Sequence, residues 1–378
     1  MQDYNQPIKM IDLAAEYQLH QPELQEKIIR VLEKGNYIKG EEVSLFEQNL
    51  AHYLDVKHVI SCGNGTDALQ IALMALNIGI GDEVIIPAFT YISAIEVVSL
   101  LGATPVLVDV DPVYFQIDTK VLAKAITKNT KAIIPVHLFG QCGNLIEIVQ
   151  LANQHQIPII EDNAQALGAK YGTEKEHKFL GTIGDIGCTS FFPTKNLACF
   201  GDGGALFTND DALAEKIRMI ANHGQKEKYE HEMVGINSRL DTLQATILNF
   251  KLNYLDQQLF TKKALANQYL KELSDLKNIL LPKQYQDSEH TWHQFTIQVD
   301  SNCRGGLKSF LKQNGIDSMI YYPKTIDQQN AYLAFANDFP ISKKLSSTVL
   351  SLPIHSLMKA EEINYVCKKI KDFFNGRN

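Results

Sequence analysis

The chain has 378 residues, of which 45% are hydrophobic and 21% charged, the balance of a globular enzyme long enough for two domains. Its formal net charge is −7 and it has no long basic run, which argues against binding to nucleic acid or to an anionic membrane surface. Six scattered cysteines without a Cys-x-x-Cys pair predict reduced thiols, no structural zinc or other metal, and a cytoplasmic protein.

The N-terminal segment has no basic start followed by an apolar run, so we expect no signal peptide, and we expect residues 1–15 to pack as an arm. No stretch approaches the roughly 18 uninterrupted apolar residues of a membrane-spanning helix. From about residue 57 to 210, short β-rich runs alternate with amphipathic patterns, which predicts a mostly parallel sheet with helices on both faces. The predicted strands are 57–61, 83–87, 105–110, 132–138, 158–162, 188–192 and 204–208, and the predicted helices are 67–76, 120–126 and 145–155. The last two strands have no helix between them, which predicts a mixed sheet at that point.

Residues 239–273 contain neither proline nor glycine and predict a long, nearly continuous helix that connects two domains. Beyond it, 292–299 and 318–322 read as strands and 360–374 as a helix, which indicates a smaller α+β unit. The sequence thus predicts an α/β protein with a large domain over 16–250 and a small domain over 251–378.

The first segment that carries chemistry is Gly-Asn-Gly-Thr-Asp-Ala at 63–68, between a predicted strand and a predicted helix. Free N–H groups at a helix N-terminus, with glycines that allow close approach, make a phosphate site. The pattern also matches the dinucleotide fingerprint of a nicotinamide enzyme, but the next strand ends in Pro87, Ala88 and Phe89 without the acidic residue that would hold a ribose. A single phosphate is favoured, and an ordinary strand-to-helix turn stays open.

The second segment is Ile-Ile-Glu-Asp-Asn-Ala-Gln at 159–165. Asp162 would follow a buried strand and lie at the carboxyl edge of the sheet, where open α/β folds bind ligands. A buried carboxylate there needs a cationic partner, such as a protonated pyridine nitrogen. Taken alone, an aspartate at a strand end is more often a helix cap or a turn residue.

The third segment places Lys195 just beyond the strand 188–192 and before a glycine-rich return at 201–204. A lysine that is desolvated at such a position has a lowered pKa and becomes a nucleophile toward an aldehyde. A lone lysine in a loop is ordinarily a solvated surface residue, so the interpretation depends on this context.

These segments together resemble the nucleotide-sugar aminotransferases of the DegT/StrS family, which are enzymes of the aspartate-aminotransferase-like superfamily dependent on pyridoxal 5'-phosphate (PLP). The resemblance covers about residues 10–360. Besides the region of Lys195, it rests on Asn-Gly-Thr-Asp-Ala-Leu at 64–69, Gly-Asp-Glu-Val at 81–84, Pro-Ala-Phe-Thr-Tyr at 87–91, Pro-Val-His-Leu-Phe-Gly at 135–140, Glu-Asp-Asn-Ala-Gln at 161–165 and Gly-Ile-Asn-Ser-Arg-Leu-Asp at 235–241. It implies a PLP-dependent aminotransferase fold of type I.

The resemblance also implies roles for residues around the cofactor. Lys195 would bond to the PLP aldehyde and then shuttle a proton, while Asp162 would keep the pyridine nitrogen protonated. Gln165 would lie near the ring hydroxyl, and Tyr91 would stack on the ring, with an ordinary aromatic core residue as the alternative for Tyr91.

The phosphate, by the same resemblance, would be held by Gly65, Thr66 and Ser190. An asparagine at the position of Asn237 reaches in from the second subunit, which implies a homodimer with shared active sites.

For the substrate, the resemblance implies less. Arg239 is a candidate carboxylate clamp, because a guanidinium offers two parallel donors, or else a surface residue near a helix N-terminus. Tyr321 and Tyr322 resemble a sugar-site segment in which relatives often carry histidine at the position of Tyr321.

The implied reaction moves an amino group from L-glutamate, through pyridoxamine phosphate, to a nucleotide-linked keto-sugar. The segments at 61–67, 140–142 and 188–193 most resemble enzymes that aminate C3 of a UDP-linked 3-keto N-acetylglucosaminuronate for surface polysaccharide such as lipopolysaccharide. A dTDP-linked 3-keto-6-deoxyhexose is the alternative. Related sugar dehydratases carry histidine where this chain has Lys195. A non-catalytic regulatory or sugar-binding protein and a nicotinamide oxidoreductase are the alternatives from other classes.

Overall fold

The computed structural model describes residues 7–173 and 176–376. Within them, seven strands form one twisted layer, because parallel bridges Ile133–Ile159 and Val136–Asp162 join a sheet of order β3-β2-β4 to one of order β5-β8-β9-β1. The strands of this layer are β1 (His58–Cys62), β2 (Glu83–Pro87), β3 (Thr104–Val108), β4 (Thr130–Ile133), β5 (Ile160–Asp162), β8 (Ile186–Ser190) and β9 (Gly204–Thr208). β9 runs antiparallel to both β8 and β1, while β2 is parallel to β3 and β4. The predicted α/β fold with a mixed sheet is confirmed.

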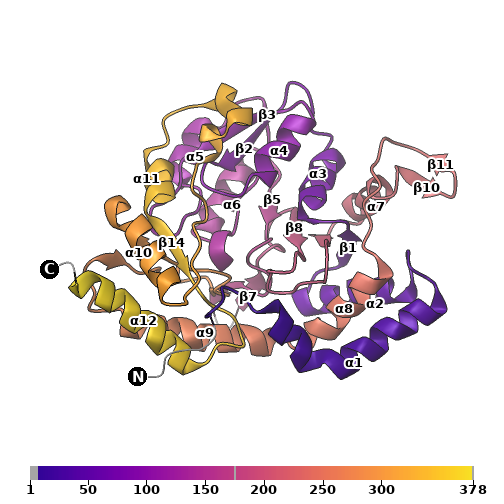
Figure 1. Cartoon of the computed structure of the whole chain (residues 1–378). Coiled ribbons are helices and arrows are strands. Elements are labelled where there is room, and N and C mark those ends of the chain that lie inside the picture. Colours follow the sequence, from indigo (N-terminus) through magenta and orange to yellow (C-terminus); the bar gives the residue numbers. More distant parts are fainter. Residues whose placement is uncertain (1–6, 174–175, 377–378) are drawn as a thin grey trace.

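Helices cover both faces of this layer (Figure 1). Side chains alternate between the faces along each strand, so Val84 and Ile86 of β2 belong to one apolar core and Ile85 to another. The first core is shared with α3, α4 and α7, the second with α5 and α6, and a third lies between α2, α8 and the β1–β9 pair. The helices of this part are α1 (Leu13–Lys34), α2 (Glu41–Leu54), α3 (Gly65–Ala75), α4 (Ser93–Leu100), α5 (Thr119–Ala125), η1 (Leu138–Gly140), α6 (Leu145–Gln154), α7 (Asp211–Ile220) and α8 (Thr242–Leu252).

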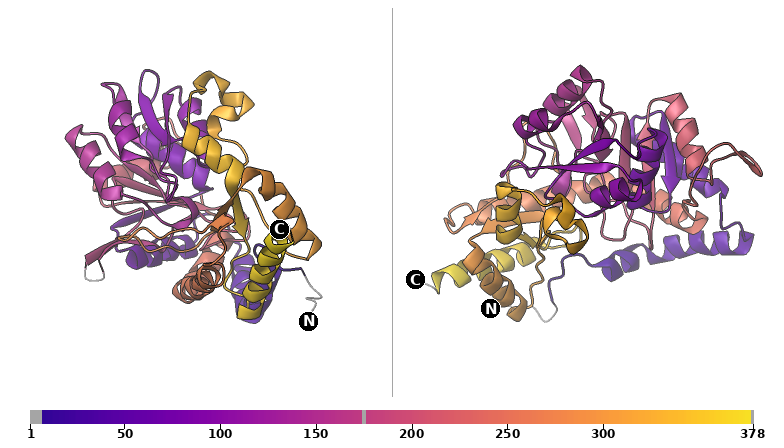
Figure 2. Two further views of the ribbon diagram at one scale, coloured as in Figure 1. Left: turned by 90° about the vertical axis from the view of Figure 1, so that its left-hand side faces the viewer. Right: turned by 90° about the horizontal axis from the view of Figure 1, so that it is seen from above.

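The C-terminal part lies beside the sheet and has its own antiparallel sheet of order β12-β13-β14 (Figure 2). Its core contains the stacked rings of Tyr269, Trp292 and Phe295 and also takes in Ile8, which bridges to Ile316. Its elements are α9 (Leu255–Glu272), β12 (Ile279–Leu280), β13 (Phe295–Val299), α10 (Ser301–Gln313), η2 (Ile326–Gln328), η3 (Asn330–Phe335), α11 (Pro340–Thr348), β14 (Val349–Leu352) and α12 (Ala360–Asn375). The domain limits 16–250 and 251–378 stay predictions, and residues 1–6 of the expected N-terminal arm lie outside the described residues.

Two hairpins complete the described chain. β6 (Lys170–Thr173) pairs with β7 (Glu176–Phe179), and β10 (Gln225–Glu227) pairs with β11 (Glu230–His231) in a hairpin that extends away from the rest of the molecule (Figure 1). Every helix in residues 7–173 and 176–376 is too short or too polar to span a lipid bilayer.

The long, nearly continuous helix expected over 239–273 is present as two helices, which begin only at Thr242 and are separated by Asn253 and Tyr254. α8 ends at Leu252 and α9 begins at Leu255, because the Asn253 amide donates to the carbonyl oxygens of Asn249 and Phe250 and so caps the last turn of α8. The chain before Thr242 is also not helical.

The expected strand 318–322 was wrong. Only Met319 pairs there, through two hydrogen bonds with Ser351, and the chain then turns so that Tyr321 and Tyr322 reach a cavity. The strand expected at 292–299 begins only at Phe295, because Trp292 has a φ of 51°, which a strand cannot accommodate.

Candidate active site

A cavity of about 470 Å³ opens at the carboxyl ends of the parallel strands. This edge is where open α/β sheets bind ligands, because the loops that follow the strands converge there. The predicted site residues that line it are Gly65, Thr66, Tyr91, Asp162, Gln165, Ser190, Lys195, Tyr321 and Tyr322. Segments far apart in the sequence therefore meet in one place.

Lys195 lies in the loop between β8 and β9. Its N–H donates to the carbonyl oxygen of Phe192, and the Phe191 N–H donates to Gly203 at the other end of the loop, so the loop closes on itself. Burial lowers the pKa of the Lys195 amine to about 8, although the nearby carboxylate of Asp162 raises it in part. The amine is therefore much closer to neutrality at physiological pH than an ordinary lysine, as a nucleophile requires.

Asp162 is the last residue of β5, and its carboxylate accepts the N–H of Ala164 at 3.0 Å. Burial raises the pKa of this carboxyl above its ordinary value, and the Ala164 N–H and Lys195 only partly oppose that effect. A carboxylate that is costly to bury gains stability from a cation placed beside it in the cavity.

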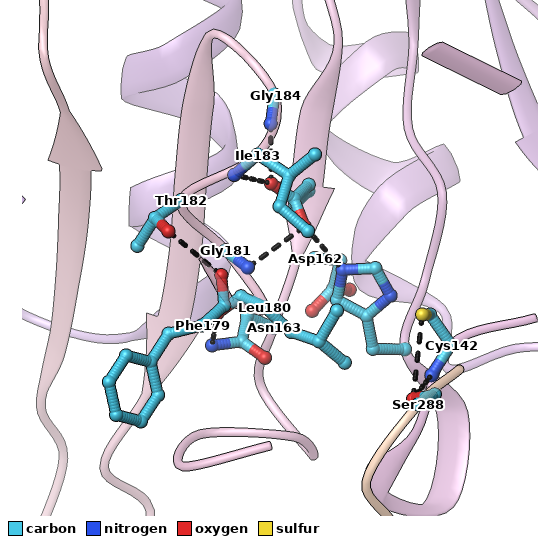
Figure 3. Close-up of polar contacts among 12 residues, drawn as sticks. Cys142, Asp162, Asn163, Phe179, Leu180, Gly181, Thr182, Ile183, Gly184 and Ser288 are labelled. Atoms are coloured by element: carbon cyan, nitrogen blue, oxygen red, sulfur yellow. Dashed lines mark hydrogen bonds and ion pairs between the residues drawn. The ribbon is translucent and has the colours of Figure 1, made fainter. Parts of the chain in front are cut away.

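Behind Asp162 lies a buried hydrogen-bonded pair, Glu161 and His137, that the sequence analysis missed. Glu161 Oε2 lies 2.7 Å from His137 Nε2, and neither side chain is exposed to water. Glu161 also accepts the N–H groups of Gly181, Ile183 and Gly184 at 2.6–2.8 Å (Figure 3). Burial would raise the Glu161 pKa, but these donors and His137 hold it below its ordinary value. The pair therefore anchors the end of β5 from which Asp162 projects.

The N-terminus of α3 forms one wall of the cavity. Asn64 caps the helix by accepting the Asp67 N–H at 2.8 Å, while the N–H groups of Gly65 and Thr66 have no hydrogen-bond partner among the described residues. A Cβ on Gly65 would lie only 2.7 Å from the Cβ of Ser190, so glycine is needed for the strand and the helix to approach this closely. Two free N–H groups beside the Ser190 hydroxyl suit a phosphate.

Gln165, Tyr91 and Tyr322 line the opposite part of the cavity. Gln165 accepts the Phe139 N–H through Oε1 at 2.7 Å and donates through Nε2 to the Tyr322 hydroxyl at 3.1 Å. The rings of Tyr91 and Tyr322 lie 5.8 Å apart, and Tyr91 is exposed. The amide of Gln165 is thus held in place, whereas the Tyr91 ring is accessible to a planar ligand.

Asn237 and Arg239 do not line this cavity. Ser238 between them is buried against α3, where its hydroxyl accepts the Gly63 N–H and donates to Asp67. Asn237 is exposed, and Arg239 lines a separate cavity of about 260 Å³ together with Lys39 and Arg218. Within one chain these two residues are apart from Lys195, and their roles stay predictions.

Thr90, His293 and Gln294 also line the cavity and were missed. The Thr90 hydroxyl is buried without a hydrogen-bond partner among the described residues. His293 and Gln294 come from the C-terminal part, about a hundred residues after Lys195, and nothing local in the sequence marks them.

The chain belongs to the DegT/DnrJ/EryC1/StrS aminotransferase family. The family's sequence pattern matches residues 18–371. The chain is therefore a PLP-dependent aminotransferase, which decides against the nicotinamide alternative and confirms the family expected from the sequence.

Three curated relatives match almost the whole chain. A "pleiotropic regulatory protein" of Geobacillus stearothermophilus is 41% identical over 97% of this chain and 98% of its own length. A UDP-2-acetamido-2-deoxy-3-oxo-D-glucuronate aminotransferase of Pseudomonas aeruginosa is 42% identical over 95% and 98%. A dTDP-3-amino-3,4,6-trideoxy-alpha-D-glucose transaminase of Streptomyces venezuelae is 41% identical over 92% and 91%. Among solved structures, S. venezuelae DesV superposes with a TM-score of 0.94 at 38% identity, over 98% of this chain and 99% of that one.

The side chains in the cavity fit PLP. The cofactor's aldehyde, pyridine nitrogen and phosphate need an amine, an acid and free N–H donors. Lys195, Asp162 and the start of α3 supply these three groups at one cavity. The close approach of Gly65 to Ser190 leaves the helix N-terminus open to the phosphate.

Proposed function

We propose that this enzyme transfers the amino group of L-glutamate to the ketone of a nucleotide-linked sugar and so makes a 3-amino sugar for surface polysaccharide. The observation that carries the proposal is the buried amine of Lys195 beside the buried carboxylate of Asp162, at a cavity that also contains a free helix N-terminus. When bound, PLP supplies an aldehyde and an electron-accepting ring that stabilises negative charge on the substrate carbon.

The residues of the chain then bind, orient and move protons. Lys195 would hold the cofactor through Nζ, and the same amine would accept and return the proton of the substrate carbon. Asp162 would keep the pyridine nitrogen protonated, and Gln165 and Tyr91 would help to hold the ring.

The phosphate is assigned to the N–H groups of Gly65 and Thr66 and to the hydroxyl of Ser190. Asn237 completes this site from a second copy of the chain, so the enzyme is a homodimer with shared active sites. The exposure of Asn237 outside its own cavity supports this assignment.

For the acceptor, a UDP-linked 3-keto N-acetylglucosaminuronate is favoured, because the P. aeruginosa relative is named for that substrate and matches the chain end to end. Arg239 of the second copy would bind its carboxylate, and Tyr321 and Tyr322 would contact the sugar. The S. venezuelae relative supports a dTDP-linked deoxysugar as the second candidate.

The enzyme acts in the cytoplasm under this proposal. Five of the six cysteines are buried and none belongs to a Cys-x-x-Cys pair, a pattern typical of reduced thiols in a reducing compartment.

The deciding experiment supplies purified enzyme with PLP, glutamate and a panel of UDP- and dTDP-linked 3-keto-sugars, and measures the release of 2-oxoglutarate. We expect turnover of the UDP-uronate with a kcat/KM at least about tenfold above that of the dTDP-sugar, and none with the Lys195→Ala control. Binding of PLP without turnover of any acceptor would reject the proposed function and favour a regulatory role.

A further inference from the structure

The segment 290–294 forms the side of the cavity that the C-terminal part contributes. It is fixed against the turn at 139–140, because the N–H groups of Thr291 and Gln294 donate to Gly140 and Phe139 at 2.8 and 3.3 Å. Gly140 has a φ of 115°, and a Cβ there would lie 3.0 Å from the backbone nitrogen of His293. The segment is therefore held by these backbone contacts, by the Thr291 hydroxyl, which also donates to Gly140, and by His290, which accepts the Trp292 N–H, and not by the side chains of His293 and Gln294.

His293 and Gln294 are buried, at 5% and 6% exposure, yet neither side chain has a hydrogen-bond partner among the described residues. Nδ1 of His293 is completely shielded from water. Buried polar groups are nearly always paired, and an unpaired one costs on the order of 1–3 kcal/mol. A ligand in the cavity cannot reach the shielded Nδ1, but Nε2 of His293 and the Gln294 amide are not shielded in this way, and a bound ligand is the partner available to them.

The chemistry of the pair indicates an uncharged ligand group. Burial, followed by the nearby charges of Lys195 and Lys262, holds the pKa of His293 well below its ordinary value, so the ring is neutral. A neutral imidazole and a carboxamide each offer a donor and an acceptor. Hydroxyl and acetamido groups offer the same combination, whereas phosphate and carboxylate groups are better matched by lysine or arginine.

We infer that His293 and Gln294 bind the hydroxyl or acetamido groups of the keto-sugar and help to select the acceptor. The inference rests on the proposed function and extends it to a specific edge of the cavity. The two side chains should matter for the half-reaction with the keto-sugar and much less for the half-reaction with glutamate, since glutamate carries two carboxylates and no hydroxyl or acetamido group.

The test compares the two half-reactions in Gln294→Leu and His293→Phe. We expect kcat/KM for the keto-sugar to fall by about tenfold or more, mainly through KM, because each change removes a hydrogen bond and leaves its partner unpaired. The single-turnover rate of 2-oxoglutarate formation from glutamate should fall much less. Gln298→Leu is the matched control. Gln298 lies on β13, outside the cavity, and its amide donates to the carbonyl oxygen of Pro112, so this variant should leave both half-reactions unchanged.

A binding measurement separates this effect from a general loss of activity. In the wild-type holoenzyme, UDP-N-acetylglucosamine should bind more tightly than UDP, and both variants should lose that difference while keeping the affinity for UDP and for PLP. Equal losses of rate in both half-reactions would overturn the inference but not the proposed function. The same holds if UDP-N-acetylglucosamine binds the wild type no more tightly than UDP, or if the variants keep that difference in affinity. A wild-type enzyme that forms no 2-oxoglutarate would instead overturn the proposed function.

Discussion

The amine of Lys195 is desolvated and has the carboxylate of Asp162 nearby, which leads to a pH prediction at the scale of one residue. With its pKa lowered to about 8, the amine should capture PLP with a midpoint near pH 8, since only the neutral form reacts and an ordinary lysine titrates at 10.5. In Asp162→Asn the midpoint should fall further, because the Asp162 charge raises the Lys195 pKa. The measurement is the rate of absorbance change when PLP is added to cofactor-free protein between pH 6 and 10.

The control for this titration is Lys195→Ala. It is needed because burial also lowers the pKa of a second amine, that of Lys262, to about 7. A midpoint near 10 in the wild type, after this background is subtracted, would contradict the assigned environment of Lys195.

At the same scale, the sequence predicted residues that lie in short motifs and missed those that act from a distance. Asp162 ends the apolar strand β5 and Lys195 lies in the short loop after β8, so their place at the sheet edge follows from local pattern. His293 and Gln294 precede β13 of the C-terminal part, and only the packing of Gly140 against them brings them to the cavity. His137 and Glu161 lie in two predicted strands, and nothing in the sequence indicates that their side chains form a hydrogen bond in the folded protein.

At the scale of an element, Glu161 ties the loop 181–184 to the end of β5. Glu161→Gln should lower the free energy of unfolding by about 3 kcal/mol, because an amide NH₂ would replace an oxygen that accepts buried hydrogen bonds and would face N–H donors. The midpoint of urea denaturation measures this. Glu147→Gln on α6, where the carboxylate accepts only the Thr119 hydroxyl in an exposed position, should change stability by less than about 0.5 kcal/mol.

The same carboxyl gives the direction of the pH dependence. The Glu161 pKa lies below its ordinary value of 4.5 in the folded protein, so its stabilisation is present above about pH 4.5 and is lost as the pH falls through the folded pKa. The difference between wild type and Glu161→Gln should therefore shrink on acidification. A difference in unfolding free energy between wild type and Glu161→Gln that grows as the pH falls would contradict the assigned contacts of the Glu161 carboxylate.

Elements whose residues decide their own conformation were predicted well. β2 and β9 have the predicted bounds, because each is an apolar run bounded by glycine, proline or a polar turn. The break between α8 and α9 was missed because it depends on one side chain, that of Asn253, whose amide caps the preceding turn. The segment 318–322 has strand-like residues, but it leaves the sheet after Met319 to supply two tyrosines to the cavity.

At the scale of the whole molecule, several large hydrophobic side chains of one stretch of the chain are exposed. They lie on α1, on α2 and on the segment between them: Leu19, Ile29, Leu32, Tyr37, Ile38 and Leu45. Exposed apolar patches of this kind mark protein interfaces. Asn237 and Arg239 lie outside the cavity of their own chain, and the proposed homodimer would supply these two groups from a second copy.

Shared sites can be tested by complementation between two inactive proteins. Lys195→Ala lacks the cofactor amine, and Asn237→Ala lacks the phosphate contact, so each homodimer should lose nearly all activity. In a heterodimer of the two, one site carries both defects and the other carries none if Asn237 acts across the interface. Co-expressed at equal levels, the pair should therefore recover about a quarter of wild-type activity, because about half of the dimers are mixed and each has one intact site. If Asn237 acted within its own chain, every site in the mixture would keep one defect and no activity would return.

The control is Lys195→Ala co-expressed with the double variant Lys195→Ala, Asn237→Ala, since no arrangement of those chains contains an intact site.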